Sequence, residues 1–360
     1  MLSQRNWRRL RPLLWPVAML YWGVSWWRNL FYRIGFFITR RVEAPVVSIG
    51  NLSVGGTGKT PATIYVAGLL MELGYRVGVL SRGYRRESSG TLLVADGKRI
   101  LASAAESGDE PSLLARRLPG VPVVVDEDRF RGAAFMLQSC PVDVIVLDDG
   151  FQHRGLERDC DLVLLDATAP KSAYHIFPYG SLRESVAGLR RADLVLWTRT
   201  ELNSPPDILV ERLMEYDIPQ ITSRMEAPAQ LQAVGSGPDL PAKELRDRRI
   251  AAFCGVARPH TFYHALMELG LEPEEVRYFP DHHRYSAADL AQLAALAPDD
   301  GWVLITTEKD AVKLPPDFTA LQRVYALRVN MVLDKAQRER LVEVLLAKLP
   351  PPGGAAKGEA

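Results

Sequence analysis

The chain has 360 residues, of which 47% are apolar and 24% charged, and its formal net charge at pH 7 is +1. This composition is typical of a folded globular protein and excludes a disordered, collagen-like or polytopic membrane chain. The three cysteines, Cys140, Cys160 and Cys254, form no CxxC pair, which argues against a zinc site or a disulfide framework and favours a reducing, cytosolic compartment.

The N-terminal segment differs from the rest of the chain. Residues 1–45 hold eight arginines and one glutamate, a net charge of +7, so the remainder carries −6. Tryptophan and arginine together favour the headgroup boundary of a membrane, where the ring keeps one edge wet and arginine meets anionic lipid. We therefore predict that residues 1–44 form a membrane-associating helix. Five of the seven tryptophans lie in it: Trp7, Trp15, Trp22, Trp26 and Trp27.

Other interpretations of this segment stay open. The uncharged apolar run Leu13–Trp27 has 15 residues and contains Pro16. Because a spanning helix needs about 20 apolar residues, a short or tilted span is the second choice. A core helix docked on the body is the main structural alternative. A cleaved signal peptide would need a small-residue cleavage site, and the tryptophans disfavour a nucleic-acid partner.

From Pro45 onward, short apolar runs alternate with helical stretches, and one helix is predicted from Lys59 to Leu73, where Gly74 ends it. Continuous β-branched runs bounded by turn residues are typical of parallel strands buried on both faces. The alternation predicts an α/β, doubly wound, mostly parallel sheet over residues 45–232. Its strands are expected at 46–49, 76–80, 121–125, 142–147, 161–165 and 192–197.

The stretch 228–246 is rich in Pro, Gly and Ser and marks a domain boundary. A second, smaller α/β domain is predicted over residues 233–347. It would contain strands at 249–253 and 302–306 and a helix around 262–269. The Pro- and Gly-rich residues 348–360 are predicted to be a disordered tail.

The strongest chemical motif lies between the first predicted strand and the first helix and is typical of a phosphate-binding P-loop. It consists of Ser53, Val54, Gly55, Gly56, Thr57, Gly58, Lys59 and Thr60. Backbone amides and the helix N-terminus would bind the phosphates of ATP. Lys59 would reach the β- and γ-phosphates, and Thr60 would ligate Mg²⁺. Because Ser53 replaces the usual first glycine, the turn is assigned to Gly55 and Gly56.

A second motif, at residues 144–149, reads Val-Ile-Val-Leu-Asp-Asp. The predicted strand delivers Asp148 and Asp149 to the C-terminal edge of the sheet, where carboxylates can hold Mg²⁺. Two carboxylates this close repel each other unless a cation lies between them. The spacing from the P-loop makes this a predicted metal site.

Motifs that are missing from the sequence exclude some classes of nucleotide-binding protein. Residues 196–201 lack the base-reading NKxD-like motif of a GTPase, and Val54 replaces the early lysine of partitioning and metallochaperone ATPases. A metallochaperone would also need a Cys/His cluster. These gaps favour a kinase that acts on a bound acceptor. A membrane scaffold that uses ATP only structurally remains the alternative.

Seven motifs, in this order, resemble the tetraacyldisaccharide 4′-kinase family from about residue 12 to residue 335. They are GNLSVGGTGKTP (50–61), SRGYRR (81–86), GDEP (108–111), VLDDGFQHR (146–154), PYGSLRE (178–184), FPDHHRY (279–285) and TTEKDAVKL (306–314). The resemblance implies ATP- and Mg²⁺-dependent phosphorylation of the 4′-hydroxyl of the lipid A disaccharide precursor, tetraacyldisaccharide 1-phosphate. It also implies attachment to the anionic cytoplasmic face of the bacterial inner membrane.

The resemblance further implies roles for single residues. Asp109 is the expected catalytic base, working with His282, and Asp148 and Asp149 would hold Mg²⁺. His153, Arg183 and Glu184 lie in motifs that border the active site, whereas the roles of Glu308, Lys309 and Asp310 stay open.

Plainer interpretations of these residues compete. Asp109 could cap the helix that begins near Pro111, and His282 could be a solvated loop residue. Because Asp109 and His282 belong to different predicted domains, they could meet only across an interdomain cleft. His260 and His264 have the spacing of a metal pair, but no third ligand completes it, so they are predicted to lie on a helix surface.

Overall fold

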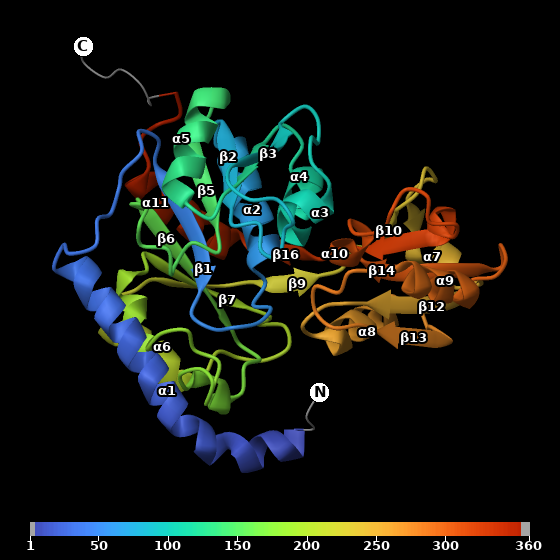
Figure 1. The fold of residues 1–360 in the computed structure, drawn as a ribbon, viewed down its shortest axis with the longest axis horizontal. Coiled ribbons are helices and arrows are strands. Elements are labelled where there is room, and N and C mark those ends of the chain that lie inside the picture. The colour runs from blue at the N-terminus through green and yellow to red at the C-terminus, as the bar shows by residue number, and fades with distance from the viewer. Residues whose placement is uncertain (1–3, 354–360) are drawn as a thin grey trace.

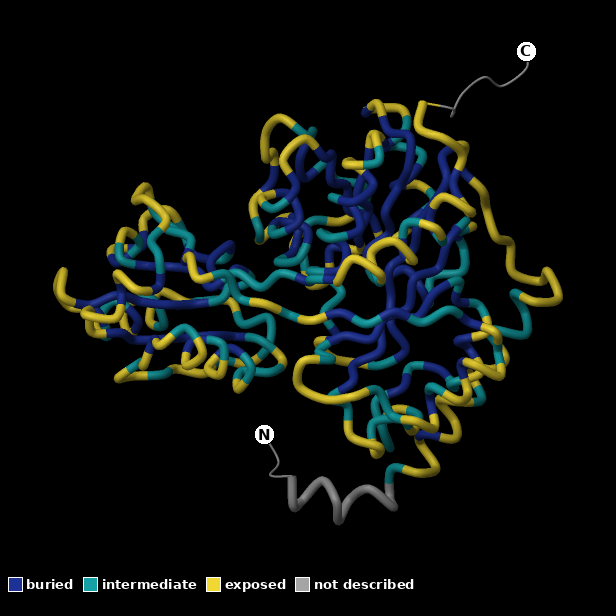
Figure 2. Tube along the Cα trace, turned by 180° about the vertical axis from the view of Figure 1, so that it is seen from behind, coloured by how far each residue is buried: buried dark blue, intermediate teal, exposed yellow. Residues whose placement is uncertain are grey.

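The computed structural model describes residues 4–353, with side chains described from residue 14 onward. Two α/β domains lie side by side, and helix α1 (Gln4–Arg33) runs along the outside of the first (Figure 1). Buried residues follow the strands of both sheets (Figure 2), so each domain has a core of its own.

The first domain is built on eight strands in the order β3-β4-β2-β5-β1-β6-β7-β8. Every neighbouring pair is parallel except β3 and β4 at one edge. The predicted parallel-dominated α/β architecture is therefore confirmed. The strands are β1 (Val46–Asn51), β2 (Val77–Ser81), β3 (Leu92–Asp96), β4 (Pro122–Val125), β5 (Val144–Asp148), β6 (Cys160–Asp166), β7 (Leu194–Thr198) and β8 (Gln220–Thr222).

Helices cover both faces of this sheet, because neighbouring residues of a buried strand point to opposite sides. Val47 packs in the cluster beneath α2 and α4, whereas Val46 packs in the cluster beneath α5. The helices are α2 (Lys59–Glu72), α3 (Ala104–Ser107), α4 (Asp109–Arg117), α5 (Arg129–Ser139) and α6 (Asp207–Glu215), with 3₁₀ turns η1 (Lys171–Tyr174) and η2 (Val186–Arg191).

The second domain has six strands in the order β11-β10-β15-β14-β12-β13, and its central strands are parallel. Its strands are β10 (Gln230–Ala233), β11 (Leu240–Pro241), β12 (Arg249–Cys254), β13 (Glu275–Tyr278), β14 (Trp302–Thr307) and β15 (Val324–Leu327). Its helices are α7 (Ala242–Leu245), α8 (Pro259–Glu268), α9 (Ala287–Leu296) and α10 (Glu308–Ala311), with the 3₁₀ turn η3 (Leu321–Arg323).

The chain returns to the first domain after β15. Strand β16 (Asn330–Val332) pairs antiparallel with β9 (Arg224–Glu226), and these two strands lie between the domains (Figure 1). Helix α11 (Lys335–Lys348) then buries Leu341 and Leu345 in the core of the first domain. The second domain is thus an insertion into the first.

The predicted range 233–347 for the second domain is therefore too long at its C-terminal end. A helix joins the core that its apolar side chains meet, and for α11 this is the first sheet. The predicted disordered tail also begins too early, because Leu349 is buried and Tyr75 Oη donates a hydrogen bond to the Pro350 carbonyl at 2.7 Å. Residues 354–360 of that tail lie outside the described part of the chain.

Helix α1 passes through Pro16 without ending and docks on the body by one face. Ala18 is buried there, and Asn29 Nδ2 donates a hydrogen bond to Glu184 at 3.1 Å. The docked-helix alternative is therefore correct for this face, yet the other face leaves large apolar side chains exposed. They include Trp15, Leu20, Trp22, Val24, Trp26 and Trp27. Trp7 and the arginines before residue 14 lie outside the described side chains.

No helix in the described part of the chain combines the length and the apolar character that a bilayer span requires.

Candidate active site

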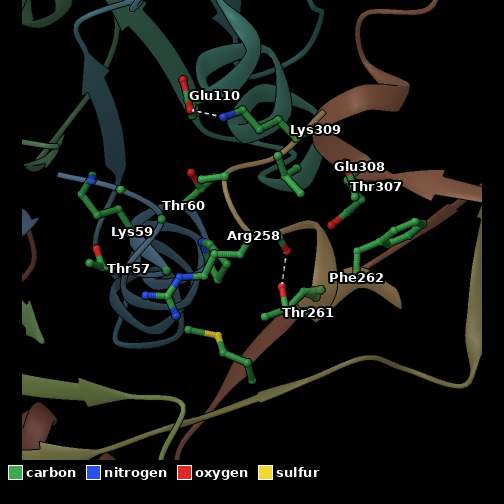
Figure 3. A pocket seen from close by; sticks show the side chains of 18 of the residues that line it. Thr57, Lys59, Thr60, Glu110, Arg258, Thr261, Phe262, Thr307, Glu308 and Lys309 are labelled. Carbon is green, nitrogen blue, oxygen red and sulfur yellow. Dashed lines mark hydrogen bonds and ion pairs between the residues drawn. The ribbon is translucent and has the colours of Figure 1, made fainter. Parts of the chain in front are cut away.

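A cavity of about 910 Å³ opens between the two domains. One wall is the carboxyl edge of the first sheet, with residues 54–61 and the Asp148–Asp149 pair. The other wall comes from the second domain, through residues 256–258, helix α8 and residues 307–309 (Figure 3). A position between domains, at the C-terminal ends of parallel strands, is the usual place for a ligand in such folds.

The P-loop joins β1 to α2, and its shape depends on glycine at two positions. Gly55 and Gly58 adopt positive φ values of 115° and 90°, whereas Gly56 does not, so only the first of the two predicted turn glycines has a backbone conformation that favours glycine. A Cβ atom at Gly58 would also lie 2.5 Å from Met225 Cε. No side chain caps α2, so the amides of its first turn are left for an anion.

Hydrogen bonds from two other strands hold the loop in place. Asn51 Nδ2, at the end of β1, donates to Thr57 Oγ1 at 2.8 Å, and Thr198 Oγ1, at the end of β7, donates to the Thr57 carbonyl at 3.0 Å. Residues Val54 to Thr60 line the cavity, but Ser53 does not. Ser53 forms a bridge to Leu182 instead, so this predicted nucleotide-binding residue lies beside the site.

Asp148 and Asp149 end β5 in different electrostatic environments. Asp148 is buried and accepts hydrogen bonds from Thr63 and Ser81, both at 3.1 Å. Burial, followed by the charge of Asp149, raises the pKa of Asp148 to about 6. Burial also acts on Asp149, but Lys59 at 3.6 Å and Arg183 at 3.1 Å outweigh it and lower the pKa of this carboxyl.

The donor set fits the magnesium ion of a P-loop enzyme. Such an ion takes one or two carboxylates, a Thr hydroxyl, phosphate oxygens and water, rather than a complete protein cage. Thr60, Asp148 and Asp149 supply these groups, and all three line the cavity. Within residues 4–353 no cluster of three or more His, Cys, Asp or Glu forms a metal cage. A cation would relieve the repulsion that raises the Asp148 pKa.

The structure brings Asp109 and His282 together from the two domains at the edge of the cavity. Asp109 begins α4 in the first domain, and His282 follows β13 in the second, yet His282 Nδ1 lies 3.1 Å from Asp109 Oδ2. His282 lines the cavity, whereas Asp109 does not. Burial raises the pKa of Asp109, but the His282 hydrogen bond, Lys313 and Lys309 outweigh it, so the net shift is downward.

The neighbours of this pair define the protonation pattern of the imidazole. Lys309 Nζ lies 3.1 Å from His282 Nε2, and an ammonium group can only donate. Nε2 therefore carries the lone pair, and Nδ1–H donates to Asp109. The N-cap of α4 is Gly108, without a side-chain capping bond, so Asp109 is not the cap that its position also suggested.

Sequence reasoning missed Glu110 and left the TTEKDAVKL string unassigned. Glu110 forms an ion pair with Lys309 at 2.9 Å across the domain gap (Figure 3). Glu308 pairs with Arg117 of the first domain at 2.6 Å. Asp310 is fully buried and accepts a hydrogen bond from the Gly255 amide, so it supports the second domain. The GDEP motif already contained Glu110, but nothing local distinguished it from Asp109.

Of the three other residues predicted to border the active site, one lines the cavity and two lie outside its lining. Arg183 lines the cavity and binds Asp149. Glu184 is buried outside the cavity wall in an ion pair with Arg191 at 2.9 Å. His153 is outside the wall as well, and burial, together with Arg129, lowers its pKa to about 4.

His260 and His264 are exposed on α8, as predicted, but at the rim of the cavity.

Comparisons with known proteins point to a single family. The family model described as "Tetraacyldisaccharide-1-P 4'-kinase" matches residues 10–349. A tetraacyldisaccharide 4′-kinase of Anaeromyxobacter dehalogenans is 43% identical over 328 residues, which cover 89% of this chain and 85% of the relative. A protein of the same name from Chlorobium limicola is 39% identical, with 85% and 87% covered. The crystal structure of LpxK from Aquifex aeolicus in complex with ATP superposes with a TM-score of 0.79 at 34% identity, covering 95% of this chain and all of that one.

Proposed function

This chain belongs to the tetraacyldisaccharide-1-P 4′-kinase family, and we propose that its interdomain cavity transfers the γ-phosphoryl group of ATP to the 4′-hydroxyl of tetraacyldisaccharide 1-phosphate, the lipid A precursor. The observation that carries the proposal is the His282–Asp109 pair, which lies across the cavity from the P-loop. A kinase needs a phosphate cradle and a proton acceptor on opposite sides of the reacting hydroxyl. A scaffold that only binds ATP needs no such acceptor.

The phosphate side of the reaction rests on the first domain. Amides of the P-loop and of the first turn of α2 bind the phosphates, and Lys59 follows the charge of the transferring group. When bound by Thr60, Asp148 and Asp149, Mg²⁺ neutralises charge on the phosphate oxygens. Arg183 fixes Asp149 in place by a hydrogen bond from Nη1 to each carboxylate oxygen, at 3.1 Å.

The proton of the sugar hydroxyl passes to His282 Nε2 in this proposal. Asp109 holds Nδ1–H and stabilises the imidazolium that forms, because its carboxylate stays ionised beside Lys309 and Lys313. This differs from the expectation that Asp109 is the base, since His282 lines the cavity and Asp109 lies behind it. Lys309 can release Nε2 to the hydroxyl because Glu110 and Asp281 also bind its ammonium group, at 2.9 and 3.2 Å.

The test is transfer of labelled phosphate from [γ-³²P]ATP to tetraacyldisaccharide 1-phosphate in detergent, followed by chromatography of the lipid. We expect a labelled lipid with the wild type and none above background with His282→Ala, while ATP binding is retained. His260→Ala, on the rim of the same cavity, is the histidine control. Hydrolysis of ATP without a labelled lipid would contradict the kinase reaction.

For the membrane, we propose that α1 lies in the anionic inner leaflet at the cytoplasmic face of the inner membrane. The exposed rings of Trp15, Trp22, Trp26 and Trp27 support this placement, since each aromatic ring on a free helix face favours the headgroup boundary. The docked face of α1 reaches the site, because Ser25 Oγ donates a hydrogen bond to the carbonyl of Arg183 at 3.4 Å. An acylated substrate in the leaflet would thus meet the enzyme near its cavity. No nucleic-acid partner is proposed.

A further inference from the structure

A buried carboxylate, Asp166, holds two arginines that belong to different domains. Asp166 ends β6, and Arg199, just after β7 in the same domain, binds it at 2.7 Å. Arg258 precedes α8 in the second domain and binds the same oxygen, Oδ2, at 2.6 Å. Both arginines line the cavity. The mechanism above uses neither of them.

The charges in this cluster do not balance. Two guanidinium groups share one carboxylate, which leaves one positive charge in excess beside the P-loop. Glu201 also lines the cavity and its charge acts on Arg199, but in the described part of the chain it forms no direct ion pair with either arginine. An arginine stays protonated in proteins, so this cluster can attract an anion into the cavity.

The two arginines differ in their exposure and in the domain that holds them. Arg199 is anchored twice, because its Nη2 also donates a hydrogen bond to the Gly56 carbonyl at 3.0 Å. Arg258 is held by Asp166 and by Thr168 Oγ1, at 2.9 Å, and both of these partners belong to the other domain. Its own domain gives its guanidinium no hydrogen bond among the described residues. The Arg258 side chain is 28% exposed, against 13% for Arg199, so Arg258 is the member more open to a ligand in the cavity.

The position of Arg258 matches a phosphate at the P-loop. A Cβ atom placed on Gly56 would lie 3.8 Å from Ala257 Cβ, so the loop that carries Arg258 touches the phosphate cradle. Figure 3 shows the Arg258 side chain extending from the second domain toward Thr57 and Lys59. Phosphates held by the P-loop amides would lie between this side chain and Lys59.

We propose that Arg258 binds the triphosphate of ATP from the second domain and stabilises the charge that develops as the γ-phosphoryl group is transferred. Asp166 and Thr168 hold the guanidinium beside the P-loop before the nucleotide arrives. Arginines supplied from outside a P-loop are worth about 10³–10⁵-fold in kcat where they stabilise such a transition state. This role rests on the proposed kinase function, but its nucleotide contacts can be tested without the lipid.

The competing explanation is an interdomain ion pair with no catalytic part. Arg284 provides the matched control, since it also joins the domains, through Glu87 at 2.6 Å, and lies outside the cavity lining. If Arg258 only ties the domains together, Arg258→Ala and Arg284→Ala should have similar effects. If Arg258 binds phosphate, only Arg258→Ala should weaken binding in proportion to the number of phosphates.

The experiment measures binding of AMP and of the non-hydrolysable analogue AMP-PCP with Mg²⁺ by calorimetry, using the full-length chain. We expect Arg258→Ala to weaken AMP-PCP binding by about tenfold or more and AMP binding by less than twofold, with Arg284→Ala close to wild type for both. Arg258→Lys should recover part of the loss, because it keeps the charge without the planar fork. This variant also covers the case in which the alanine variant folds poorly.

Lipid phosphorylation supplies the second measurement. We expect kcat to fall about 10³-fold in Arg258→Ala, with thermal melting within a few degrees of Arg284→Ala. Equal weakening of AMP and AMP-PCP, or equal kcat in the two variants, would overturn the assignment. A wild type that binds AMP-PCP through Arg258 but labels no lipid would instead refute the kinase function alone.

Discussion

The two walls of the cavity are built in different ways. The centre of the first wall is formed by two short segments, residues 54–60 and 148–149, which leave neighbouring strands of one sheet. Its shape comes from the backbone, through the glycines at positive φ and the uncapped start of α2. The second wall consists of helix α8 and short segments of the inserted domain, and four of its charged or polar side chains are held by partners in the first domain: Arg258, His282, Glu308 and Lys309.

Three of these partnerships cross the gap near the reacting groups: Asp109 with His282, Glu110 with Lys309, and Asp166 with Arg258. The difference teaches that the backbone cradle for phosphate is built within one domain, whereas proton transfer and the proposed Arg258 contact require both. Substitutions in the first wall should therefore change nucleotide binding or phosphoryl transfer independently of one another. Substitutions of a second-wall residue and of its first-domain partner should have non-additive effects on activity.

The largest effect should come from the first wall. Lys59→Ala removes the cation nearest the transferring phosphoryl group, and we expect kcat to fall about 10³–10⁵-fold. Lys335→Ala is the control, since Lys335 is exposed and pairs only with Glu339 of its own helix. A steady-state lipid kinase assay with both variants measures the effect. Near-normal kcat in Lys59→Ala would mean that the nucleotide binds elsewhere.

The His282–Asp109 pair should show the coupling expected of the second wall. We expect His282→Ala or Asp109→Ala to lower kcat about 10²–10⁴-fold. The kcat of the double variant should be only slightly lower than that of the less active single variant, because the two side chains act as one catalytic unit. ATP affinity should barely change in any of them.

Asp207→Ala is the control for the helix start, since Asp207 is also an acid in a first turn, that of α6. It should leave kcat unchanged. If the losses of the two single variants multiply in the double variant, Asp109 and His282 act independently, and the proposed pair is wrong.

Asp148 should make the first wall sensitive to pH. Its folded-state pKa of about 6 lies above the ordinary value of 3.8, so ionisation of this buried group destabilises the metal-free fold. This destabilisation is complete above about pH 6 and absent below the pKa of Asp148 in the unfolded chain. We expect Asp148→Asn to increase the free energy of unfolding of the metal-free protein at pH 8 by up to about 3 kcal/mol, which a higher melting temperature would report. Near pH 3.5 the melting temperature should be unchanged.

Mg²⁺ should reverse this balance, because the metal favours the ionised carboxylate. Wild-type protein should gain thermal stability from Mg²⁺ with ATP at pH 8, and the gain should shrink as protons compete below about pH 6. Asp148→Asn should show little gain at either pH. An equal stabilisation of both proteins by the metal would place its site away from Asp148.

Substitutions in α1 should have the smallest effect on catalysis but a clear effect on membrane attachment. Replacing Trp22 and Trp26 with alanine should lower partition onto phosphatidylglycerol vesicles about tenfold or more, with nucleotide binding unchanged. Tyr278→Ala, an exposed aromatic of the second domain, is the control. High salt should weaken attachment only in part, since screening reaches the arginines and not inserted rings. Complete release by salt alone would contradict an inserted aromatic face.

The parts of the molecule that sequence could predict are those determined by neighbours along the chain. Helix α2 was expected at Lys59–Leu73 and is found at Lys59–Glu72. The strand before Asp148 was likewise expected from its apolar run, because such a run between turn residues is a local signal. The P-loop and the carboxylate pair lie in contiguous segments of this kind.

The parts that sequence could not predict depend on contacts between distant residues. Asp166 and Arg258 are 92 positions apart, and each taken alone is an ordinary charged residue. Which member of the Asp109–His282 pair faces the cavity depends on the approach of the two domains. The domain assignment of α11 failed for the same reason, since its apolar side chains would fit either core.

The insertion of one domain into the other has a consequence for the order of folding during synthesis. Leu341 and Leu345 complete the core of the first domain, but the ribosome adds them after the whole second domain. Chains emerge at about 5–20 residues per second, and domains generally fold as units as they appear. The N-terminal domain therefore waits several seconds with an open hydrophobic face beneath α2, while the inserted domain can already close. The part of the protein that is translated first is the part that matures last.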